Sequence, residues 1–252
     1  MSDNLSVAII IQARMGSSRL PGKVLKKIDD LPLLGILVDR LRAKNPDQYN
    51  IIVATTIQDI DDPIEKYCHE QDISVCRGSE KDVLGRYCDA IELYRPDIVV
   101  RITADCPLID PDLIRMGVDY LINHYENTDY VSNTVKRTYA RGLDFEVFKA
   151  SDLIEINKTT DDSEDREHVT PYFYKNPAVY KIHQVTCEGD NFEDYRWTVD
   201  TSEDFHFVEK VLKHFISKNM VETFDHSDVL DLLSLNPAWR EINAHIQQKT
   251  LK

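Results

Sequence analysis

The sequence predicts an α/β protein in which a mainly parallel sheet, covered by helices on both faces, is followed by a smaller mixed α/β part. Over about the first 125 residues, short β-branched and apolar runs alternate with stretches of helical spacing, which is typical of a parallel sheet. The 252 residues contain no Gly/Ser-rich or Pro-rich linker. We therefore expect a single domain spanning residues 1–252.

The first part of the chain has the clearest pattern. Val7–Ile11 is a continuous β-branched and apolar run, as in strands buried on both faces. Further buried strands are predicted at Ile51–Ala54 and Ile98–Ile102, and a short strand at Ser74–Cys76. Helical spacing predicts helices at Leu33–Leu41, Pro63–Gln71, Lys81–Tyr94 and Pro111–His124. Pro32 is expected at the first position of the first helix.

The alternation breaks near Asn127–Tyr139, which we take as a subdomain boundary. Beyond it, the pattern predicts strands at Asp144–Phe148, Val179–Val185 and Trp197–Val199. It predicts helices at Ser151–Asn157, Arg166–Lys175, Glu203–Lys218, Val229–Leu235 and Trp239–Gln247.

Composition excludes several classes of protein. The net charge of −14 disfavours binding to nucleic acid or to anionic membranes, which draw on basic surface. No apolar run approaches the ~18 residues of a membrane span, and no signal-peptide pattern is present, so we expect a cytoplasmic protein. The five cysteines include no Cys-x-x-Cys pair, which disfavours a zinc site or a disulfide framework.

The loop after the first strand is the first candidate for chemistry. Its cations are Arg14, Arg19 and Lys23, and they alternate with small residues such as Gly16 and Ser17. Ligands of open parallel sheets bind beyond the carboxyl ends of the strands, and glycines let backbone amides approach phosphate oxygens. The loop matches neither common glycine-rich nucleotide motif. It is a phosphate site or, alternatively, an ordinary basic surface loop.

Two aspartates that follow predicted strands are the second candidate. Asp105 follows Ile98–Ile102, and Asp200 follows Trp197–Val199. Carboxylates at such strand ends can hold a divalent metal ion that bridges phosphates. Alternatively, Asp105 is a turn residue and Asp200 belongs to a helix start. The acidic stretch Asp59–Asp62 is expected to form a solvated loop.

The segment Ile10–Lys23 resembles the opening signature of the sugar-acid cytidylyltransferases, which include the 3-deoxy-manno-octulosonate and acylneuraminate enzymes. Five further segments resemble those of the spore-coat-polysaccharide branch of this family: Arg77–Leu84, Arg101–Pro111, Gly142–Phe148, Arg166–Tyr172 and Arg196–Asp204. The likeness covers about residues 5–215. It departs from the octulosonate enzymes at Thr103–Pro107, where they have Gly-Asp-Glu-Pro.

The resemblance implies a Rossmann-like sheet of the nucleotide-diphospho-sugar transferase type and a Mg²⁺-dependent nucleotidyltransferase. Such an enzyme joins CTP to a sugar acid, giving a CMP-sugar and pyrophosphate for surface polysaccharide or glycoconjugate synthesis. It also implies a nucleotide-binding part at about 1–126, an acceptor and dimerisation part at about 127–195, and C-terminal helices at about 203–252. A homodimer is expected. The apolar C-terminal residues would serve the dimer or pack on their own core: Val229, Leu230, Leu232, Leu233, Leu235 and Trp239.

Site residues carried over from the family fall into four groups. The catalytic residues would be Arg14, Lys23 and Asp105. The nucleotide would contact Ala13, Arg14, Gly16, Ser17, Arg19, Lys23, Arg77, Ser79 and Asp105. Mg²⁺ would be held by Asp105 and Asp200, and the acceptor by Arg166, His168 and Arg196.

Three other functions stay open. A glycosyltransferase shares the fold type, although Ala104-Asp105-Cys106 lacks the usual Asp-x-Asp. A nucleotidyltransferase for another nucleotide or acceptor is a near neighbour. A nucleotide-binding protein with a decayed site is the non-enzymatic alternative, and retention of the charged loop and both aspartates counts against it.

Overall fold

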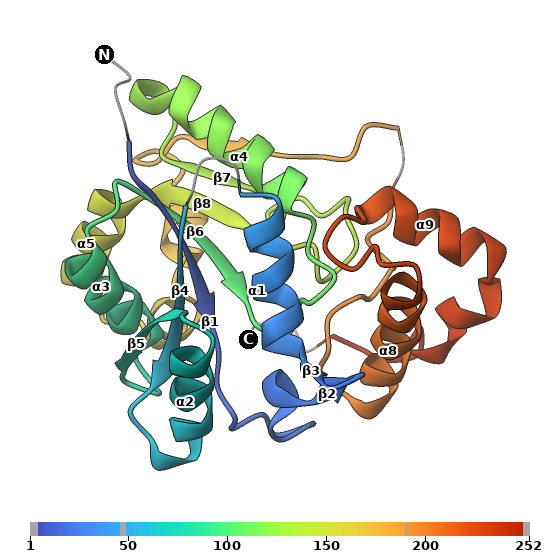
Figure 1. The fold of residues 1–252 in the computed structure, drawn as a ribbon. Coiled ribbons are helices and arrows are strands. Elements are labelled where there is room, and N and C mark those ends of the chain that lie inside the picture. The colour runs from blue at the N-terminus through green and yellow to red at the C-terminus, as the bar shows by residue number, and fades with distance from the viewer. Residues whose placement is uncertain (1–4, 46–48, 190, 249–252) are drawn as a thin grey trace.

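In a computed structural model that describes residues 5–45, 49–189 and 191–248, the chain forms a seven-stranded sheet with helices on both faces (Figure 1). The strand order is β5-β4-β1-β6-β8-β7-β9. The strands are β1 (Val7–Gln12), β4 (Asn50–Thr56), β5 (Ser74–Gly78), β6 (Ile98–Thr103), β7 (Tyr130–Ser132), β8 (Glu146–Lys149) and β9 (Ile182–Gln184). A separate small hairpin pairs β2 (Lys27–Ile28) with β3 (Leu31–Pro32).

The parallel half of the sheet is centred on β1, as predicted. β1 pairs in parallel with β4 on one side and β6 on the other, and Ile9 lies opposite Ile51 and Val100. Side chains of β1 alternate between two cores: Ile9 and Ile11 face one, and Ala8 and Ile10 face the other. Burial on both faces accounts for the continuous apolar runs of these strands.

The other half of the sheet changes direction. β8 runs antiparallel to both β6 and β7, and β9 joins the far edge in parallel with β7. Pairing of β6 with β8 places Arg101 opposite Glu146. The mainly parallel sheet with a mixed extension is the predicted fold class.

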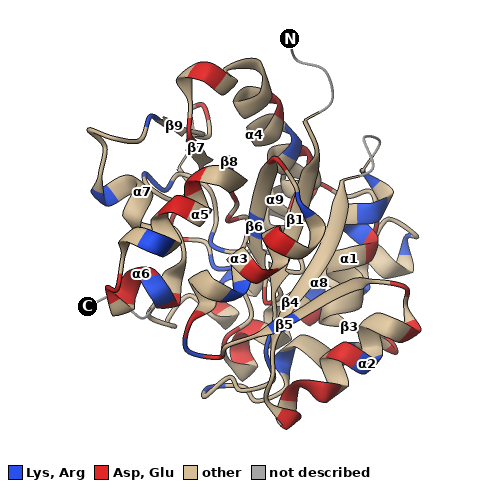
Figure 2. Ribbon diagram, turned by 90° about the vertical axis from the view of Figure 1, so that its left-hand side faces the viewer, with Lys and Arg blue, Asp and Glu red and all other residues tan. Residues whose placement is uncertain are grey.

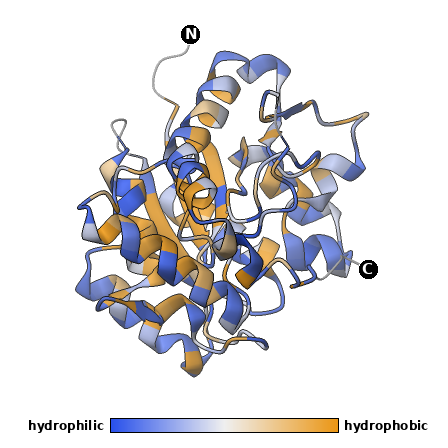
Figure 3. Ribbon diagram, turned by 90° about the vertical axis from the view of Figure 1, so that its right-hand side faces the viewer, coloured by the Kyte–Doolittle hydropathy of each residue, from blue (hydrophilic) through white to orange (hydrophobic). Residues whose placement is uncertain are grey.

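Nine helices of the described chain cover the sheet. They are α1 (Leu33–Ala43), α2 (Asp62–Glu70), α3 (Val83–Tyr94), α4 (Pro111–Asn123), α5 (Ala150–Thr159), α6 (Ser163–His168), α7 (Pro171–Lys175), α8 (Ser202–Ser217) and α9 (His226–Leu235). Buried residues of α1, α4, α8 and α9 share one core with the sheet, and those of α3, α5 and α7 share the other. Figure 3 shows apolar colouring concentrated on the strands and on inward helix faces.

Acidic and basic residues are interspersed over these outer helices (Figure 2). Short 3₁₀ turns at Lys23–Leu25, Asp59–Asp61, Tyr125–Asn127 and Pro237–Ile242 complete the elements. Pro32 is the N-cap of α1 and not its first residue. It is extended, because it pairs with Lys27 in the hairpin.

Three predicted elements of the second part are wrong. Trp197–Val199 forms no strand, because its amides pair with two different segments: Trp197 N donates to Arg141 O and Val199 N to Asp105 O. The helix expected at Arg166–Lys175 is interrupted between α6 and α7. The helix expected at Trp239–Gln247 is replaced by the last 3₁₀ turn and loops.

The C-terminal helices pack on the domain's own core. Val229, Leu232 and Leu233 are buried there, whereas Leu235 is 80% exposed. Arg40 of α1 links α1 to the segments before α4 and α9, because its guanidinium donates hydrogen bonds to the carbonyls of Val221, Ile109 and Phe224 at 2.7–3.1 Å. None of the described helices is long and apolar enough to cross a membrane.

Candidate active site

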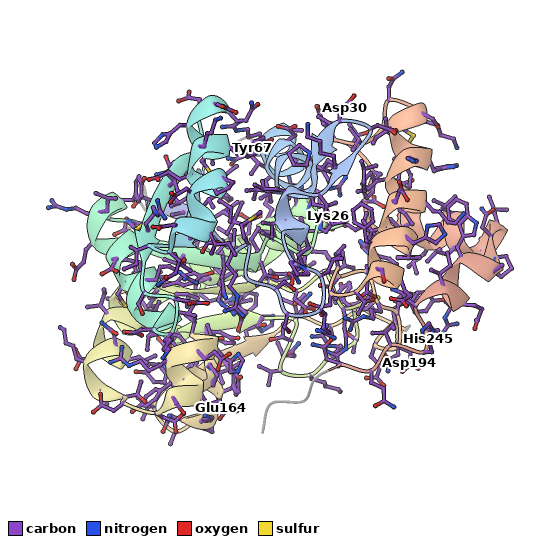
Figure 4. All side chains as sticks on the ribbon, turned by 90° about the horizontal axis from the view of Figure 1, so that it is seen from below. Lys26, Asp30, Tyr67, Glu164, Asp194 and His245 are labelled. Carbon is purple, nitrogen blue, oxygen red and sulfur yellow. The ribbon has the colours of Figure 1, made fainter. Side chains whose placement is uncertain are left out.

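The loop that follows β1 lies at the carboxyl edge of the parallel strands, on the side viewed in Figure 4. Met15 O accepts hydrogen bonds from the amides of Ser17 and Gly22, both at 2.9 Å. Gly22 has φ +69°, which suits glycine. These bonds fold the loop back on itself and bring Lys23 under the sheet edge.

Asp61 corrects the expectation that Asp59–Asp62 is a solvated loop. Its side chain is buried, and Oδ1 accepts a hydrogen bond from Met15 N at 2.6 Å. Its other oxygen accepts from Thr56 Oγ1. Asp61 therefore fixes the start of the cationic loop against the end of β4.

Lys23 joins the two aspartates predicted as metal ligands. Its Nζ lies 2.6 Å from Asp105 Oδ2 and 2.8 Å from Asp200 Oδ1, and it donates to Val199 O at 2.7 Å. Asp105 follows β6, and Val199 N donates back to Asp105 O at 2.8 Å. Three segments that are far apart in sequence thus meet at one ammonium group.

Two arginines complete the cluster around Asp200. Arg19 Nη2 and Arg196 Nη2 each lie 2.8 Å from Asp200 Oδ2. Arg196 is also bound to Asp204, whose side chain is fully buried. Three cations and three carboxylates therefore balance one another beneath the loop.

The opposite charges in this cluster shift the pKa values of Lys23 and Asp200 so that both groups stay charged. Burial alone would lower the pKa of Lys23, but the neighbouring carboxylates outweigh burial and raise that pKa above its ordinary value. Burial alone would raise the pKa of Asp200, but the surrounding cations, Lys23 first among them, hold it below its ordinary value. Both groups are charged at neutral pH.

Three adjoining cavities open around this cluster. The first, about 300 Å³, is lined by Arg14, Ser17, Arg19, Lys23, Asp105 and Asp200, among others. The second, about 510 Å³, shares Gln12, Arg14 and Glu167 with the first. The third, about 380 Å³, shares Thr103 with the first and both Arg101 and His168 with the second. Small-molecule sites commonly measure ~300–1,000 Å³. We call them the loop cavity, the α3 cavity and the β8 cavity.

Most of the predicted loop residues lie where the sequence suggested. Arg14 is nearly half exposed, and its weak contact with Glu80 at 3.7 Å leaves it available to a ligand. Ala13 continues the β1 backbone, with its N donating to Ala54 O at 3.1 Å. Gly16 belongs to the same loop, with a Cβ position that would lie 3.9 Å from Glu80.

Besides Ala13 and Gly16, four predicted contact residues line none of these three cavities. Arg77 is bound to Asp62 and Glu65 of α2, and Arg166 to Asp82 and Asn157. Ser79 Oγ accepts from Asp82 N at the start of α3. Arg196 is committed to Asp200 and Asp204. Each of these four side chains is held by contacts within the chain.

His168 does line a cavity, and an unusual turn helps to place it. Val169 has φ +74° and ψ −53°, a conformation that β-branched residues rarely adopt. Thr170 N donates to His168 O at 2.9 Å across it. The turn ends α6 and leaves both His168 and Thr170 on the β8 cavity.

Sequence reasoning missed several lining residues. Arg101 and Glu146 face each other across β6 and β8 and form an ion pair on the β8 cavity. An arginine inside the otherwise apolar run Ile98–Ile102 is a sequence signal for this site. Gln12, Asp144 and Glu167 also line the cavities and lie within the segments that carry the family resemblance, whereas Arg86 and Arg137 line them from outside those segments.

Asp105 and Asp200 fit a magnesium site. Both carboxylates are mostly buried and already converge on one cation, Lys23. The described residues contain no cluster of three or more His, Cys, Asp or Glu side chains suited to a metal. Mg²⁺ is commonly held by one or two carboxylates, with water and substrate phosphates as its other ligands, so this pair suffices.

Comparison with known proteins places this geometry in context. A family model described as cytidylyltransferase matches residues 8–231. The spore coat polysaccharide biosynthesis protein SpsF of Bacillus subtilis is 34% identical over 92% of this chain and 95% of its own. A 3-deoxy-manno-octulosonate cytidylyltransferase of Idiomarina loihiensis is 32% identical over 47% of each chain. The solved structure of a cytidylyltransferase from Leptospira borgpetersenii superposes with a TM-score of 0.88 at 35% identity, covering 99% of this chain and 100% of that one.

Proposed function

The chain belongs to the cytidylyltransferase family, and on that premise we propose that it joins CTP to a sugar acid and releases pyrophosphate. The product would be a CMP-sugar for surface polysaccharide or glycoconjugate synthesis. The names of the spore coat and octulosonate relatives support this class of acceptor. We also propose that the protein is a homodimer, on the basis of the family resemblance, and that it is cytoplasmic, on the basis of its composition.

The observation that carries the proposal is the charge cluster beneath the loop. A triphosphate is strongly anionic, and a protein with net charge −14 would repel it. Arg14, Arg19 and Lys23 line the loop cavity and supply local positive charge. Together with Asp105 at the end of β6 and Asp200 just before α8, they would form a site for phosphates and a divalent cation.

The β8 cavity is the proposed acceptor site. It adjoins the loop cavity at Thr103 and contains the paired groups Arg101–Glu146 and Arg137–Asp144. Such groups, together with the hydroxyls of Thr134 and Thr170, offer hydrogen bonds to sugar hydroxyls and to a carboxylate. An acceptor bound there would present a hydroxyl toward the loop cavity.

In the proposed reaction, an acceptor oxygen attacks the α-phosphorus of CTP and the bond to pyrophosphate breaks. Phosphoryl transfer depends mainly on positioning and charge stabilisation. Lys23 and Arg19 would offset charge on the leaving pyrophosphate, and Arg14 would orient the triphosphate. Mg²⁺, bound by Asp105 and Asp200, would neutralise phosphate charge and lower the barrier.

Replacement of Asp105 tests the proposal. Pyrophosphate release is measured with CTP, Mg²⁺ and a panel of sugar acids. We expect Asp105→Ala to lower turnover by about 10²- to 10³-fold, as when other groups that stabilise transition-state charge are removed. Asp112→Ala on α4 is the matched control, since its carboxylate is 39% exposed and lies on none of the three cavities. Near-normal release by Asp105→Ala would contradict this role. Failure of wild-type enzyme with every sugar acid would contradict the acceptor class.

A further inference from the structure

Arg86 on α3 is buried without a counter-ion. Its side chain is 1% exposed, and Nη1 donates to Ser79 O at 2.9 Å. Within the described chain, neither Nε nor Nη2 has a hydrogen-bond partner, and no carboxylate lies within 4.0 Å. Burial lowers the pKa of Arg86. A buried charge of this kind destabilises the folded protein unless something else compensates it.

The position of Arg86 suggests what compensates it. Arg86 lines the α3 cavity, which continues into the loop cavity through Gln12, Arg14 and Glu167. Its stem packs on Gly78 at the end of β5, where an added Cβ would lie 3.0 Å from Arg86 Cγ. The guanidinium is therefore held beside the phosphate-binding loop, at the place where the remainder of a nucleotide would extend.

We propose that the unpaired Nε–Nη2 edge of Arg86 binds the O2 and N3 atoms of cytosine and so selects CTP. This inference rests on the proposed function. Because Nη1 is engaged by Ser79 O, the remaining parallel N–H groups are those of Nε and Nη2. Cytosine presents two adjacent acceptors, O2 and N3, and a guanidinium edge binds such a pair in bidentate fashion.

The same edge rejects uracil. Uracil carries a hydrogen on N3, so one N–H of Arg86 would face another donor. Leaving buried donors unpaired costs far more than a missing contact. A lysine could not replace Arg86, because an ammonium is a point charge without a planar pair of donors.

The test compares dissociation constants for CTP and UTP by isothermal titration calorimetry, using the full-length wild-type protein, Arg86→Met and Arg86→Gln. A bidentate pair of hydrogen bonds to a base commonly contributes about a 10- to 100-fold preference in affinity for that base over the wrong one. We expect Arg86→Met to weaken CTP binding by that factor and to bind UTP at least as tightly as wild type, because the donor that faces N3–H of uracil is gone, so that the selectivity is lost. Arg86→Gln offers one donor and one acceptor, which match O2 and N3–H of uracil, so its preference should shift to UTP. Arg115→Met, an exposed arginine on α4, is the control and should keep the wild-type ratio.

Denaturation without nucleotide separates this role from a structural one. If Arg86 serves the ligand, Arg86→Met should be at least as stable as wild type, because an uncompensated buried charge is removed. A variant that keeps the wild-type preference for CTP would overturn the inference while the proposed function stands. Loss of stability in Arg86→Met together with unchanged selectivity in Arg86→Gln would assign Arg86 to the fold. A wild-type protein that binds no nucleotide would overturn the proposed function itself.

Discussion

Asp204→Asn should destabilise the protein sharply, although it changes only one atom of a side chain outside the cavities. The Asp204 side chain is fully buried at the start of α8, where it forms a capping box with Thr201. Its two oxygens accept five hydrogen bonds within the described chain, from Arg196 Nε and Nη2, Asn243 Nδ2, and the amides of Asp200 and Thr201.

The expected magnitude follows from these donors. An asparagine can accept at only one of the two positions, so at least two donors would face its NH₂ group. In the better orientation it loses Arg196 Nε, a charged donor worth about 1.5–3 kcal/mol, and Asn243 Nδ2, worth about 1 kcal/mol. Arg196 is 6% exposed and would keep only Asp200 as a counter-ion. Removing one partner of a buried ion pair commonly costs about 3–5 kcal/mol.

We therefore expect Asp204→Asn to lower the free energy of unfolding by about 3–5 kcal/mol. For a chain of this length that corresponds to a fall in Tm of roughly 6–20 °C. The assay is urea unfolding followed by the fluorescence of buried Trp197. Glu203→Gln, one residue earlier and exposed, should change stability by less than about 0.5 kcal/mol. A loss under about 1 kcal/mol in Asp204→Asn would refute the reasoning.

Two further substitutions test other contacts. Gly142→Ala should lower the free energy of unfolding by about 2–4 kcal/mol, because φ is +104° and the new Cβ would lie 2.6 Å from the Trp197 carbonyl carbon. The control Gly189→Ala, with φ +83° and no atom within 4 Å of the new Cβ, should lower it by only about 1 kcal/mol. Equal losses of stability in thermal denaturation would reject the steric explanation. His226→Gln should cost about 1–3 kcal/mol near pH 5, where His226 and Asp110 are both charged and 2.6 Å apart. The hydrogen bond to Asp110 raises the pKa of His226 above 6.5, so this stabilisation is complete below pH 6.5 and is lost as the pH rises through the raised value. Burial alone would raise the pKa of Asp110, but its hydrogen bonds to His226 hold that pKa below 3.8. The contribution of the carboxylate to stability is therefore lost only as the pH falls through that lower value. If the stability difference between His226→Gln and wild type stayed constant from pH 5 to above the raised pKa of His226, the ion pair would not be its cause.

The strands of the parallel half could be predicted because a strand that is buried on both faces consists mainly of apolar residues, which can be recognised in the sequence. Val7–Ile11 and Ile51–Ala54 are continuous apolar runs where they pair, and Ile98–Ile102 is interrupted only by Arg101. β7 was not predicted, because its three residues are defined by pairing with β8 and β9 rather than by their own pattern. The break between α6 and α7 combines the positive φ of Val169, which no residue preference anticipates, with Pro171 at the first position of α7, which the sequence did offer as a signal.

The part of the site that could be predicted consists mainly of residues that follow a strand. The loop of Lys23 follows β1 and Asp105 follows β6, and the carboxyl ends of these parallel strands share one edge. Asp200 reaches the same place without a strand, through the bond from Val199 N to Asp105 O. The sequence did not distinguish an arginine that lines a cavity without a counter-ion from one that is paired with carboxylates of its own chain. Arg77 and Arg196 are bound by carboxylates at 2.6–2.8 Å, whereas Arg86 has none. That difference arises from packing between helices and strands, not from local sequence.

The division of the sheet at β6 has a consequence for engineering this enzyme. Apart from Arg101, Ile102 and Thr103 of β6, the residues that line the β8 cavity all come from the stretch 134–174. The donor loop at 12–24 and the aspartates that bind Lys23 lie outside that stretch. Ser163, Glu167 and His168 of that stretch line the other two cavities. A mutant library over residues 134–174 that keeps these three fixed would therefore vary the proposed acceptor site and leave the lining of the loop and α3 cavities unchanged. Chimaeras that exchange this stretch between family members are expected to carry acceptor preference with it.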